Sequence, residues 1–324
     1  MKRVSLLLSL SIGSLLAKDI TLLNVSYDPT RELYAEYNEA FAKHWKEKTG
    51  DSVKVDQSHG GSGKQARAII DGLEADVATL ALAADINALH EKGGLLPEDW
   101  QKRLPHNSTP YTSTIVFLVR KGNPKGINDW NDLIKPGVEV ITPNPKTSGG
   151  ARWNIMAIYG SQIAEGKSPA EAQDFVKQVL ANTSVQDSSA RDSLNTFSSG
   201  KGDVLVGYEN DAIQAKKDNI DLEYVTPDNT ILIENPIAVT KDAPSEAQKF
   251  LDFLYTDQGQ QNFADAGYRP VVKSVADKNA SKFPTPSGLF TIAKFGGWAK
   301  VSDPFFGDNG WVIQAEKDLG NPTS

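Results

Sequence analysis

Four short segments of the chain combine small or polar residues with the expected start of a helix. They are Ser26–Pro29, His59–Gly63, Lys146–Gly150 and Ser188–Arg191. The first N–H groups of a helix have no partner within the helix, and its aligned peptide dipoles place about half a positive charge there. Anion binding is therefore the chemistry that these segments favour.

Glycines strengthen this interpretation for two of the segments. Gly60, Gly61 and Gly63 lie in the second segment, and Gly149 and Gly150 lie in the third. Without side chains, the backbone at a helix start can approach a ligand closely. Two segments precede residue 110 and two follow it, so a cleft between two domains would place them opposite one another.

Helix capping is the structural alternative for some of the same residues. Asp28 is a favourable N-cap residue, and Pro29 follows at the first helical position, where its missing N–H costs nothing. Ser62 and Gln65 have the spacing of a capping box. Taken alone, these residues leave both roles open.

The sequence offers little support for catalysis or metal binding. A phosphate-binding loop would need glycine where Ser58 stands and serine or threonine where Gln65 stands. No nucleophile-elbow pentapeptide occurs, and the carboxylates are scattered rather than paired. Metal-ligand spacing is absent among the histidines, which are His44, His59, His90 and His106. We expect no enzyme activity, no metal and no cofactor.

The elements that must position the four segments alternate between short apolar runs and amphipathic stretches, which indicates an α/β fold. The expected strands are Ile20–Ser26, Val53–Gln57, Ala75–Leu82, Ser113–Val119, Val138–Pro143, Asp203–Tyr208, Leu222–Thr226 and Pro236–Thr240. Helices are expected after Asp28, after Ser62, from about Gly150, and over residues 169–181 and 244–262. The first of them places Leu33, Tyr37 and Phe41 on one face, because they are four residues apart.

The first residues predict export. Lys2 and Arg3 precede an apolar stretch, Val4–Leu16, that ends at Ala17, so residues 1–17 have the pattern of a cleaved signal peptide. The 324-residue chain contains no cysteine, which excludes disulfides and thiolate metal sites. Its net charge of −7 makes nucleic acid and anionic lipid poor partners. Its length predicts two domains.

Several long runs resemble the periplasmic sulfate-binding proteins in order and spacing. They are Leu22–Leu33, Gln57–Gln65, Tyr111–Pro124, Ile141–Asn154 and Phe295–Trp298. The resemblance covers essentially the whole chain after the signal peptide. It implies a periplasmic, monomeric receptor that passes sulfate to the membrane permease of an ABC importer and has no nucleic-acid partner.

The fold implied by this resemblance is the two-domain type II periplasmic-binding-protein fold, in which two strands cross at a hinge. We expect domain I to comprise residues 18–112 and 238–324, and domain II to comprise residues 113–237. The chain should cross near Tyr111–Thr114 and return near Asn235–Val239. The C-terminal helices would then belong to the first domain.

The resemblance also implies a binding site made of neutral donors. Backbone N–H donors carried onto this sequence are those of Asp28, Ser62, Gly149, Gly150 and Ala190, and Ser148 supplies its hydroxyl. Tyr208 stands where the family commonly has a tryptophan indole donor, and a phenol can accept as well as donate. Arg152 and Arg191 lie close to these donors in the sequence and are expected to act outside direct contact with the ligand.

The ligand is the part of this interpretation with the most alternatives. Thiosulfate, phosphate, molybdate and tungstate share the tetrahedral shape, and an exported ester hydrolase is a candidate of another class. The Asp28 carboxylate would reverse the selectivity if it accepted a proton from phosphate. We therefore expect it to cap its helix through the N–H of Thr30 or Arg31.

Overall fold

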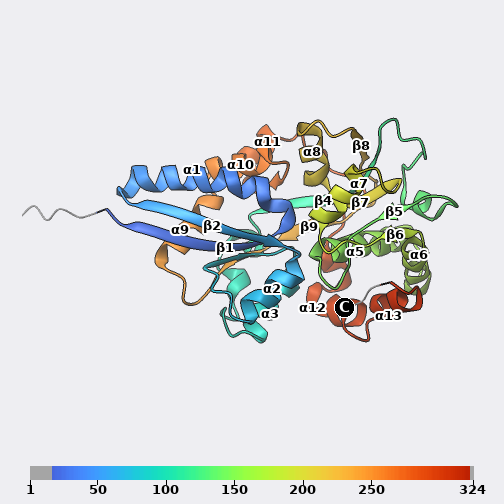
Figure 1. The fold of residues 1–324 in the computed structure, drawn as a ribbon, viewed down its shortest axis with the longest axis horizontal. Helices are drawn as coiled ribbons and strands as arrows, with labels where there is room; N and C mark the ends of the chain where they lie inside the picture. Colours follow the sequence, from blue (N-terminus) through green and yellow to red (C-terminus); the bar gives the residue numbers. More distant parts are fainter. Residues whose placement is uncertain (1–16, 322–324) are drawn as a thin grey trace, which may run out of the picture.

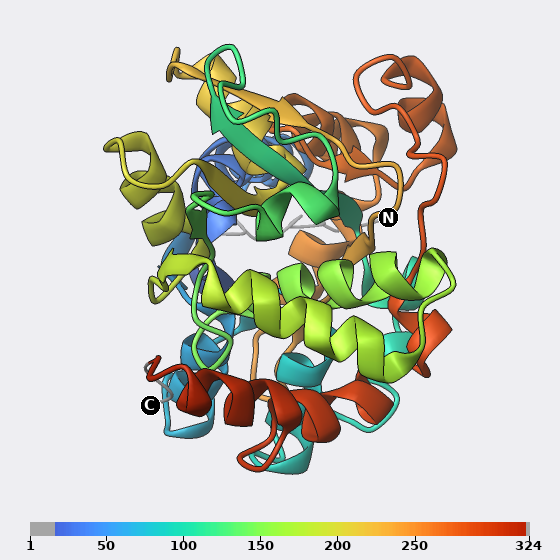
Figure 2. The same ribbon diagram turned by 90° about the vertical axis from the view of Figure 1, so that its right-hand side faces the viewer.

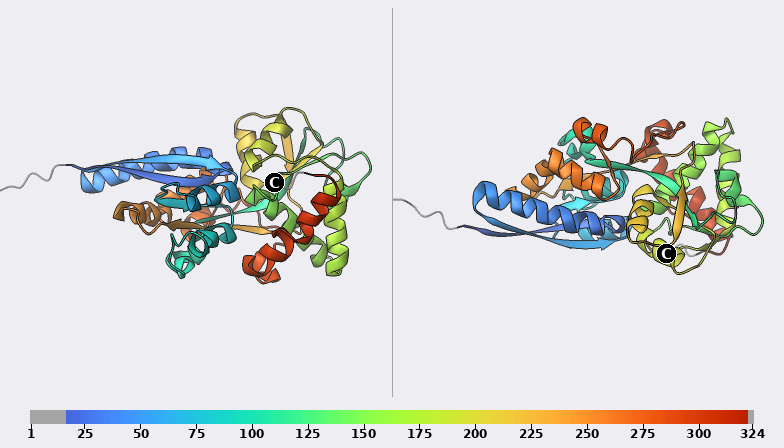
Figure 3. Two further views of the ribbon diagram at one scale, coloured as in Figure 1. Left: turned by 60° about the horizontal axis from the view of Figure 1, so that its bottom comes forward. Right: turned by 90° about the horizontal axis from the view of Figure 1, so that it is seen from above.

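The computed structural model describes residues 17–321 and contains two separate β-sheets, each with helices packed against it. Figure 1 shows one sheet in each half of the molecule, and Figure 3 shows the same two halves from two further directions. The predicted signal peptide lies outside the described residues apart from Ala17. Within the described part of the chain, no helix has the length and hydropathy of a membrane span.

The first half, here called the first lobe, is built on a four-stranded sheet of order β10-β3-β1-β2. Its strands are β1 (Asp19–Tyr27), β2 (Ser52–Gly60), β3 (Val77–Thr79) and β10 (Ile237–Val239). β1 pairs in parallel with β2 and β3, whereas β10 runs antiparallel to β3. Its helices are α1 (Arg31–Thr49), α2 (Ser62–Ile70), α3 (Ala83–Glu91), α9 (Ser245–Leu254) and α10 (Asp257–Asp265).

The second half, the second lobe, is built around the long strand β4 (Tyr111–Arg120). Its other strands are β5 (Val140–Ile141), β6 (Thr183–Val185), β7 (Val204–Tyr208), β8 (Leu222–Val225), β9 (Leu232–Asn235) and β11 (Arg269–Pro270). The helices are α5 (Gly149–Ala164), α6 (Pro169–Ala181), α7 (Ala190–Ser198) and α8 (Glu209–Lys217).

Shorter elements connect these layers and extend the chain beyond them. They are η1 (Asp28–Thr30), η2 (Trp100–Lys102), α4 (Pro105–Ser108), η3 (Trp130–Ile134), α11 (Lys273–Lys278), η4 (Ile292–Phe295), α12 (Trp298–Phe306) and α13 (Trp311–Asp318). The chain passes into the second lobe along β4 and returns where Pro236 joins β9 to β10. Tyr111 and Asn235 pair at this point, so the two crossing segments lie side by side.

Apolar periodicity correctly predicts the long helices. Leu33, Tyr37 and Phe41 are buried on one face of α1, where Tyr37 and Phe41 meet the ring of Phe250 edge-on. α6 has the predicted bounds because Ser168 and Glu171 form a capping box at its start. Burying such faces contributes about 25 cal/mol for each Å² of apolar surface removed from water.

Other elements differ from the predictions. The helix expected over residues 244–262 is two helices, because Thr256 ends the run and caps α10 by accepting from the N–H of Gly259. The short strands β6, β9 and β11 were not predicted. Each has two to four residues, too few to show a clear alternation of apolar and polar positions.

The last two helices, α12 and α13, depart from the expected assignment to the first domain, whereas α9 and α10 pack in the first lobe. Trp298 of α12 and Val312 of α13 share a hydrophobic core with α5 and α6, and the rings of Trp298 and Trp153 meet edge-on at 4.7 Å. Figure 2 shows α12 and α13 beside α5 and α6 of the second lobe. α12 also contacts α3 of the first lobe. The remaining domain limits stay a prediction.

Candidate functional site

Four helix starts, two from each lobe, meet at one pocket between the lobes. The pocket occupies about 170 Å³, open solvent included, and is lined by the turns that begin η1, α2, α5 and α7. Every residue expected to contact a ligand lines it, namely Asp28, Ser62, Ser148, Gly149, Gly150, Ala190 and Tyr208. The fold therefore brings together residues as far apart in the sequence as Asp28 and Tyr208.

The start of α2 is free of side-chain caps, which contradicts the predicted capping box. The Ser62 hydroxyl instead donates to Asp85 Oδ2 at 2.6 Å and accepts from the N–H of Ala81 at 2.9 Å. The Gln65 amide reaches back to the Ser26 carbonyl. Because no side chain caps this helix, its first N–H groups remain available to the pocket.

Asp28 does not cap its helix either, so this prediction was wrong. Its carboxylate lies 2.6 Å from the Arg31 guanidinium, and no side-chain cap bond is present at η1 or α1. The spacing of three residues in a tight turn brings the two charged groups together. The Asp28 carboxylate is therefore paired with the Arg31 guanidinium of the same turn.

The helix starts of the second lobe are capped by serine side chains, which the sequence analysis did not predict. Ser148 caps α5 by accepting from the N–H of Ala151 at 3.3 Å, and Ser189 caps α7 by accepting from Asp192. A serine hydroxyl also carries one hydrogen to donate. The hydroxyl of Ser148, which is 3% exposed, can therefore cap its helix and still donate into the pocket.

Glycines set how closely the two lobes approach. A Cβ atom on Gly61 would lie 2.5 Å from the Thr147 carbonyl oxygen and 2.9 Å from that of Ser188, both in the second lobe. A Cβ on Gly149 would lie 3.1 Å from the Cβ of Ser62 in the first lobe. The backbones are thus packed against each other around the pocket, and the cleft is closed.

Hydrogen bonds and ion pairs cross the closed cleft beside the pocket. The Trp153 indole donates to the Ala81 carbonyl at 2.8 Å. Arg152 lies 3.3 Å from the buried Asp85 carboxylate, and Arg191 pairs with Glu32. Both arginines lie outside the pocket lining, as expected, and each joins one lobe to the other.

The groups that line the pocket are nearly all neutral. Asp28 is the one lining residue with an ionisable acidic or basic side chain apart from the two tyrosines, Tyr27 and Tyr208. Burial, with the nearby Asp211 and Asp85 carboxylates, raises the pKa of Tyr208, which therefore keeps its proton at neutral pH. Burial and the charge of Arg31 lower the pKa of His59, behind the pocket, to about 4, so that it adds no positive charge.

The Tyr208 hydroxyl gives the clearest indication that the pocket binds a hydrogen-bond acceptor. It is buried, with the side chain 1% exposed, and it has no hydrogen-bond partner among the described residues. An unsatisfied buried hydroxyl costs about 1 to 3 kcal/mol. A bound acceptor would remove that cost.

Several neighbours of the site carry no signal in the sequence. Asp85 links the Ser62 hydroxyl to Arg152, which lies 67 residues after Asp85 in the sequence. Glu32 pairs with Arg191, which lies 159 residues after it. No local motif marks these contacts. Within residues 17–321, no group of three or more histidine, cysteine or acidic residues is arranged to hold a metal ion.

Residues 23–269 match the family described as bacterial extracellular solute-binding protein. The chain belongs to this family. Among solute-binding proteins, the sulfate-binding protein of Salmonella typhimurium is 53% identical over 325 residues, covering 97% of this chain and 98% of that protein. The thiosulfate-binding protein of Escherichia coli is 43% identical over 300 residues and covers 89% of each chain.

A solved solute-binding protein has the same fold. The sulfate-binding protein SubI from Mycobacterium tuberculosis is 37% identical, superposes with a TM-score of 0.83, and covers 87% of this chain and 98% of that one. The predicted α/β periplasmic-binding-protein fold is therefore confirmed. In this fold the pocket described above lies where the two lobes of the solute-binding protein meet.

Asp211 makes the stability of this solute-binding protein depend on pH. Its carboxyl group is 4% exposed at the start of α8, and burial raises its pKa to about 7 despite the opposing charge of Arg191; Glu32 and Asp28 raise the pKa further. Between about pH 4 and pH 7 the folded protein keeps a proton that the unfolded chain has released. The free energy of unfolding should therefore fall as the pH rises through this window.

Chemical denaturation of the wild type and of Asp211→Asn across this range measures the effect. As the pH rises, the free energy of unfolding of the wild type should fall by up to about 1.4 kcal/mol per pH unit relative to that of the variant. Above pH 7 the difference between the two free energies should be constant. Parallel curves for the two proteins would show that Asp211 titrates normally.

Proposed function

We propose that this solute-binding protein is exported, captures sulfate in the pocket between its lobes, and delivers it to the membrane permease of an ABC importer. It acts as a monomer and catalyses no reaction in this proposal. One observation carries the proposal: the pocket is surrounded by helix starts and neutral donors and has no cationic side chain in its lining. The names of the related sulfate-binding proteins support the same ligand.

Neutral donors favour sulfate for a simple reason. At neutral pH sulfate carries no proton, and all of its oxygens accept. Phosphate keeps at least one proton, which needs an acceptor in the pocket. The one carboxylate in the lining, that of Asp28, is paired with Arg31. An unpaired buried proton donor costs about 1 to 3 kcal/mol, or about 5- to 150-fold in affinity.

The donors together can balance the loss of sulfate's water shell. In the proposal, the N–H groups of Asp28, Ser62, Gly149, Gly150 and Ala190 point at the anion. The hydroxyls of Ser148 and Tyr208 complete the set. Hydrogen bonds to a charged acceptor contribute about 1.5 to 3 kcal/mol each. Affinity in the micromolar range or tighter, about −8 kcal/mol, is therefore expected.

Thiosulfate is the second candidate ligand. A relative named as thiosulfate-binding protein is 43% identical to this chain, and the sulfur atom that replaces one oxygen of sulfate needs room or a softer partner. The phenol ring of Tyr208 differs in shape from the indole ring that the family commonly has at this position, so it borders the pocket differently. A phenol also accepts a hydrogen bond, which an indole N–H cannot do.

Calorimetry on the mature protein tests the proposed ligand. Sulfate, thiosulfate, phosphate, molybdate and selenate should be titrated at matched pH and ionic strength. Selenate is the matched control, because it is a tetrahedral dianion without a proton at neutral pH. We expect sulfate to bind at least tenfold more tightly than phosphate, with selenate closer to sulfate. Tighter binding of phosphate than of sulfate would exclude the proposed selectivity.

A further inference from the structure

Two consecutive residues, Tyr268 and Arg269, each hold a turn that lines the ligand pocket. Tyr268 contacts the turn of η1 in the first lobe, and Arg269 contacts the start of α8 in the second lobe. Both residues lie outside the pocket lining. Arg269 begins β11, which pairs with Tyr111 and Thr112 of β4, so the two residues stand where the chain crosses between the lobes.

The hydroxyl of Tyr268 donates to the Pro29 carbonyl at 2.7 Å. The side chain is buried, and its ring meets that of Tyr111 edge-on at 4.7 Å. Burial raises the pKa of Tyr268, so its hydroxyl keeps the proton that it donates. Pro29 directly follows Asp28, so this bond acts on the turn whose N–H is proposed to contact the anion.

The turn of η1 depends on this bond for its place in the protein. The Thr30 hydroxyl donates to the Tyr27 carbonyl at 2.7 Å, which shapes the turn from within but does not fix it to other elements. The Tyr268 hydroxyl joins the turn to a position 239 residues later in the chain. The direction of the turn relative to the second lobe is therefore set at β11.

The guanidinium of Arg269 holds the second turn. It forms two parallel bonds to the Glu209 carboxylate, at 2.8 Å and 2.9 Å. It also donates to the main-chain carbonyls of Phe283, at 3.3 Å, and Pro284, at 2.9 Å. Glu209 is the first residue of α8 and directly follows Tyr208. The ion pair therefore fixes the backbone that carries the Tyr208 ring.

Stability alone does not account for this ion pair. Arg269 is 9% exposed and Glu209 is 1% exposed. Replacing such a buried pair with apolar residues is often neutral or even stabilising, because both charges lose their water. The planar fork of arginine instead provides a fixed geometry, since it binds a carboxylate in one orientation. Hydrogen bonds weaken steeply away from their preferred distance and angle, so fixed geometry benefits the Tyr208 hydroxyl.

We propose that Tyr268 and Arg269 are positioning residues for the anion pocket. Tyr268 sets the direction of the Asp28 N–H, and Arg269 sets the place of the Tyr208 hydroxyl. Because the two residues are adjacent, one short segment of chain aligns donors from both lobes on the same anion. This inference rests on the proposed capture of sulfate.

Tyr268→Phe removes the bond to the Pro29 carbonyl and should weaken sulfate binding about three- to tenfold in calorimetry. Tyr37→Phe is the matched control, because the buried Tyr37 hydroxyl also donates to a main-chain carbonyl at 2.7 Å, that of Phe250, and lies outside the pocket lining. Both variants should lose stability, but Tyr37→Phe should keep its affinity. Unchanged affinity in Tyr268→Phe, or equal losses in the two variants, would overturn the role of Tyr268.

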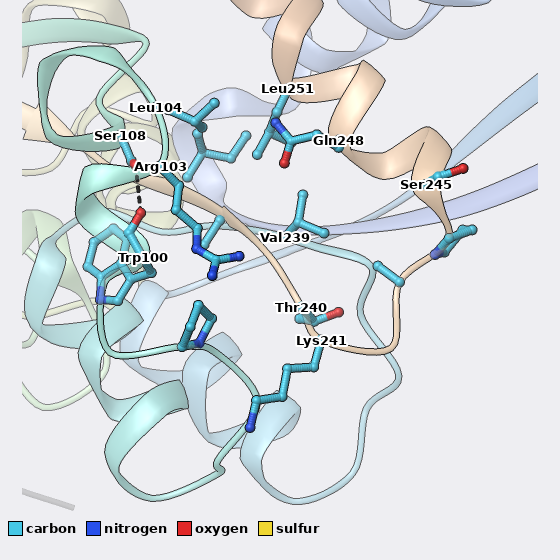
Figure 4. A pocket seen from close by; sticks show the side chains of 15 residues that line it. Trp100, Arg103, Leu104, Ser108, Val239, Thr240, Lys241, Ser245, Gln248 and Leu251 are labelled. Atoms are coloured by element: carbon cyan, nitrogen blue, oxygen red, sulfur yellow. Dashed lines mark hydrogen bonds between the residues drawn. The ribbon is translucent and has the colours of Figure 1, made fainter.

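A second control lies in a groove of the first lobe that is lined by different residues from the ligand pocket. Figure 4 shows the bond there from the buried Ser108 hydroxyl to the Trp100 carbonyl, at 2.9 Å. Ser108→Ala also removes a hydroxyl that donates to a main-chain carbonyl of the first lobe. It should lower the stability and leave the affinity for sulfate unchanged. Affinity that falls alike in Ser108→Ala and Tyr268→Phe would follow stability and would refute positioning.

The amide resonance of Asp28 reports on the direction of its N–H. In NMR spectra of the wild type, saturating sulfate should shift this resonance downfield, because the N–H then donates to a charged acceptor. Tyr268→Phe should reduce this shift and leave that of the Gly150 amide, in the second lobe, unchanged. An Asp28 shift equal to that of the wild type would contradict the proposal.

Arg269→Lys keeps the positive charge but loses the fork that holds the Glu209 carboxylate. It should weaken sulfate binding about three- to tenfold in the wild type. In the Tyr208→Phe variant it should have almost no further effect, because the hydroxyl that it positions is gone. Additive losses beside tight wild-type binding would refute the positioning alone, whereas a wild type that does not bind sulfate would refute the proposed function as well.

Discussion

Replacing Gly61 with alanine should reduce the affinity for sulfate by at least about a hundredfold while leaving the protein folded. The added Cβ would lie 2.5 Å and 2.9 Å from two main-chain carbonyl oxygens of the opposite lobe, and neither oxygen can rotate away as a side chain could. Overpacking of this kind costs about 1 to 3 kcal/mol, and here two backbone contacts are affected together. That cost falls on the closed state alone.

The open state should tolerate the same change, because the lobes are then apart and the methyl group meets solvent. A ligand that needs closure loses affinity in proportion to the cost of closing. Calorimetry with sulfate gives the affinity, and small-angle X-ray scattering with saturating sulfate shows whether the lobes still close. Denaturation without ligand should give a midpoint close to that of the wild type.

Gly60→Ala is the matched control. Gly60 adjoins Gly61, but the atoms nearest to a Cβ there belong to the flexible side chain of Gln65, the first at 3.4 Å. Its affinity for sulfate should stay within a few fold of the wild type. If the two alanine variants lose affinity equally, the effect belongs to the flexibility of the glycine segment and not to contact between the lobes.

Replacing Tyr208 with phenylalanine should weaken sulfate binding about 10- to 150-fold and leave the unliganded protein as stable as the wild type or more stable. The hydroxyl is buried without a partner, so its removal costs the unliganded protein nothing. With the anion present, the variant loses one donor to a charged acceptor, a loss of about 1.5 to 3 kcal/mol. Opposite effects on stability and affinity distinguish a ligand contact from a packing role.

Tyr27→Phe provides the comparison. Tyr27 also lines the pocket, and its ring lies 6.1 Å from that of Tyr208, but its hydroxyl is 3.3 Å from the hydroxyl of Tyr111. We expect this variant to lose stability and to keep most of its affinity. Unchanged sulfate binding in Tyr208→Phe, measured by calorimetry, would place the Tyr208 hydroxyl outside the ligand contacts.

Much of the fold was predictable because its main elements are long enough to show a period. β1 contains Ile20, Leu22, Leu23 and Val25, and β4 contains the apolar run Ile115–Val119. α1 repeats its apolar residues every four positions. β6, β9 and β11 are too short for this, and their existence depends on partners elsewhere in the chain. The sequence shows that α12 is amphipathic, but not that its face packs on α5 rather than on the first lobe.

The pocket residues were predicted from the resemblance to the periplasmic sulfate-binding proteins. They lie where a strand ends or a helix begins, and such positions gather at one edge of each sheet in this class of fold. The side-chain partners were not predictable in the same way. Ser62 and Gln65 fit a capping box by spacing, yet Asp85 and the Ser26 carbonyl compete successfully for them in the folded protein. Tertiary hydrogen bonds of this kind override local capping preferences.

The placement of the C-terminal segment has a consequence for how the lobes separate. The chain crosses between them along β4 and along β9 and β10, and it crosses again from α10 of the first lobe to β11 of the second. β11 pairs with β4 at Tyr111, which also pairs with Asn235, so the three crossing segments lie together at the hinge. Away from these strands, α12 packs on α5 and also contacts α3 of the first lobe. Separating the lobes must therefore break the contact between α12 and α3 as well as the contacts around the pocket.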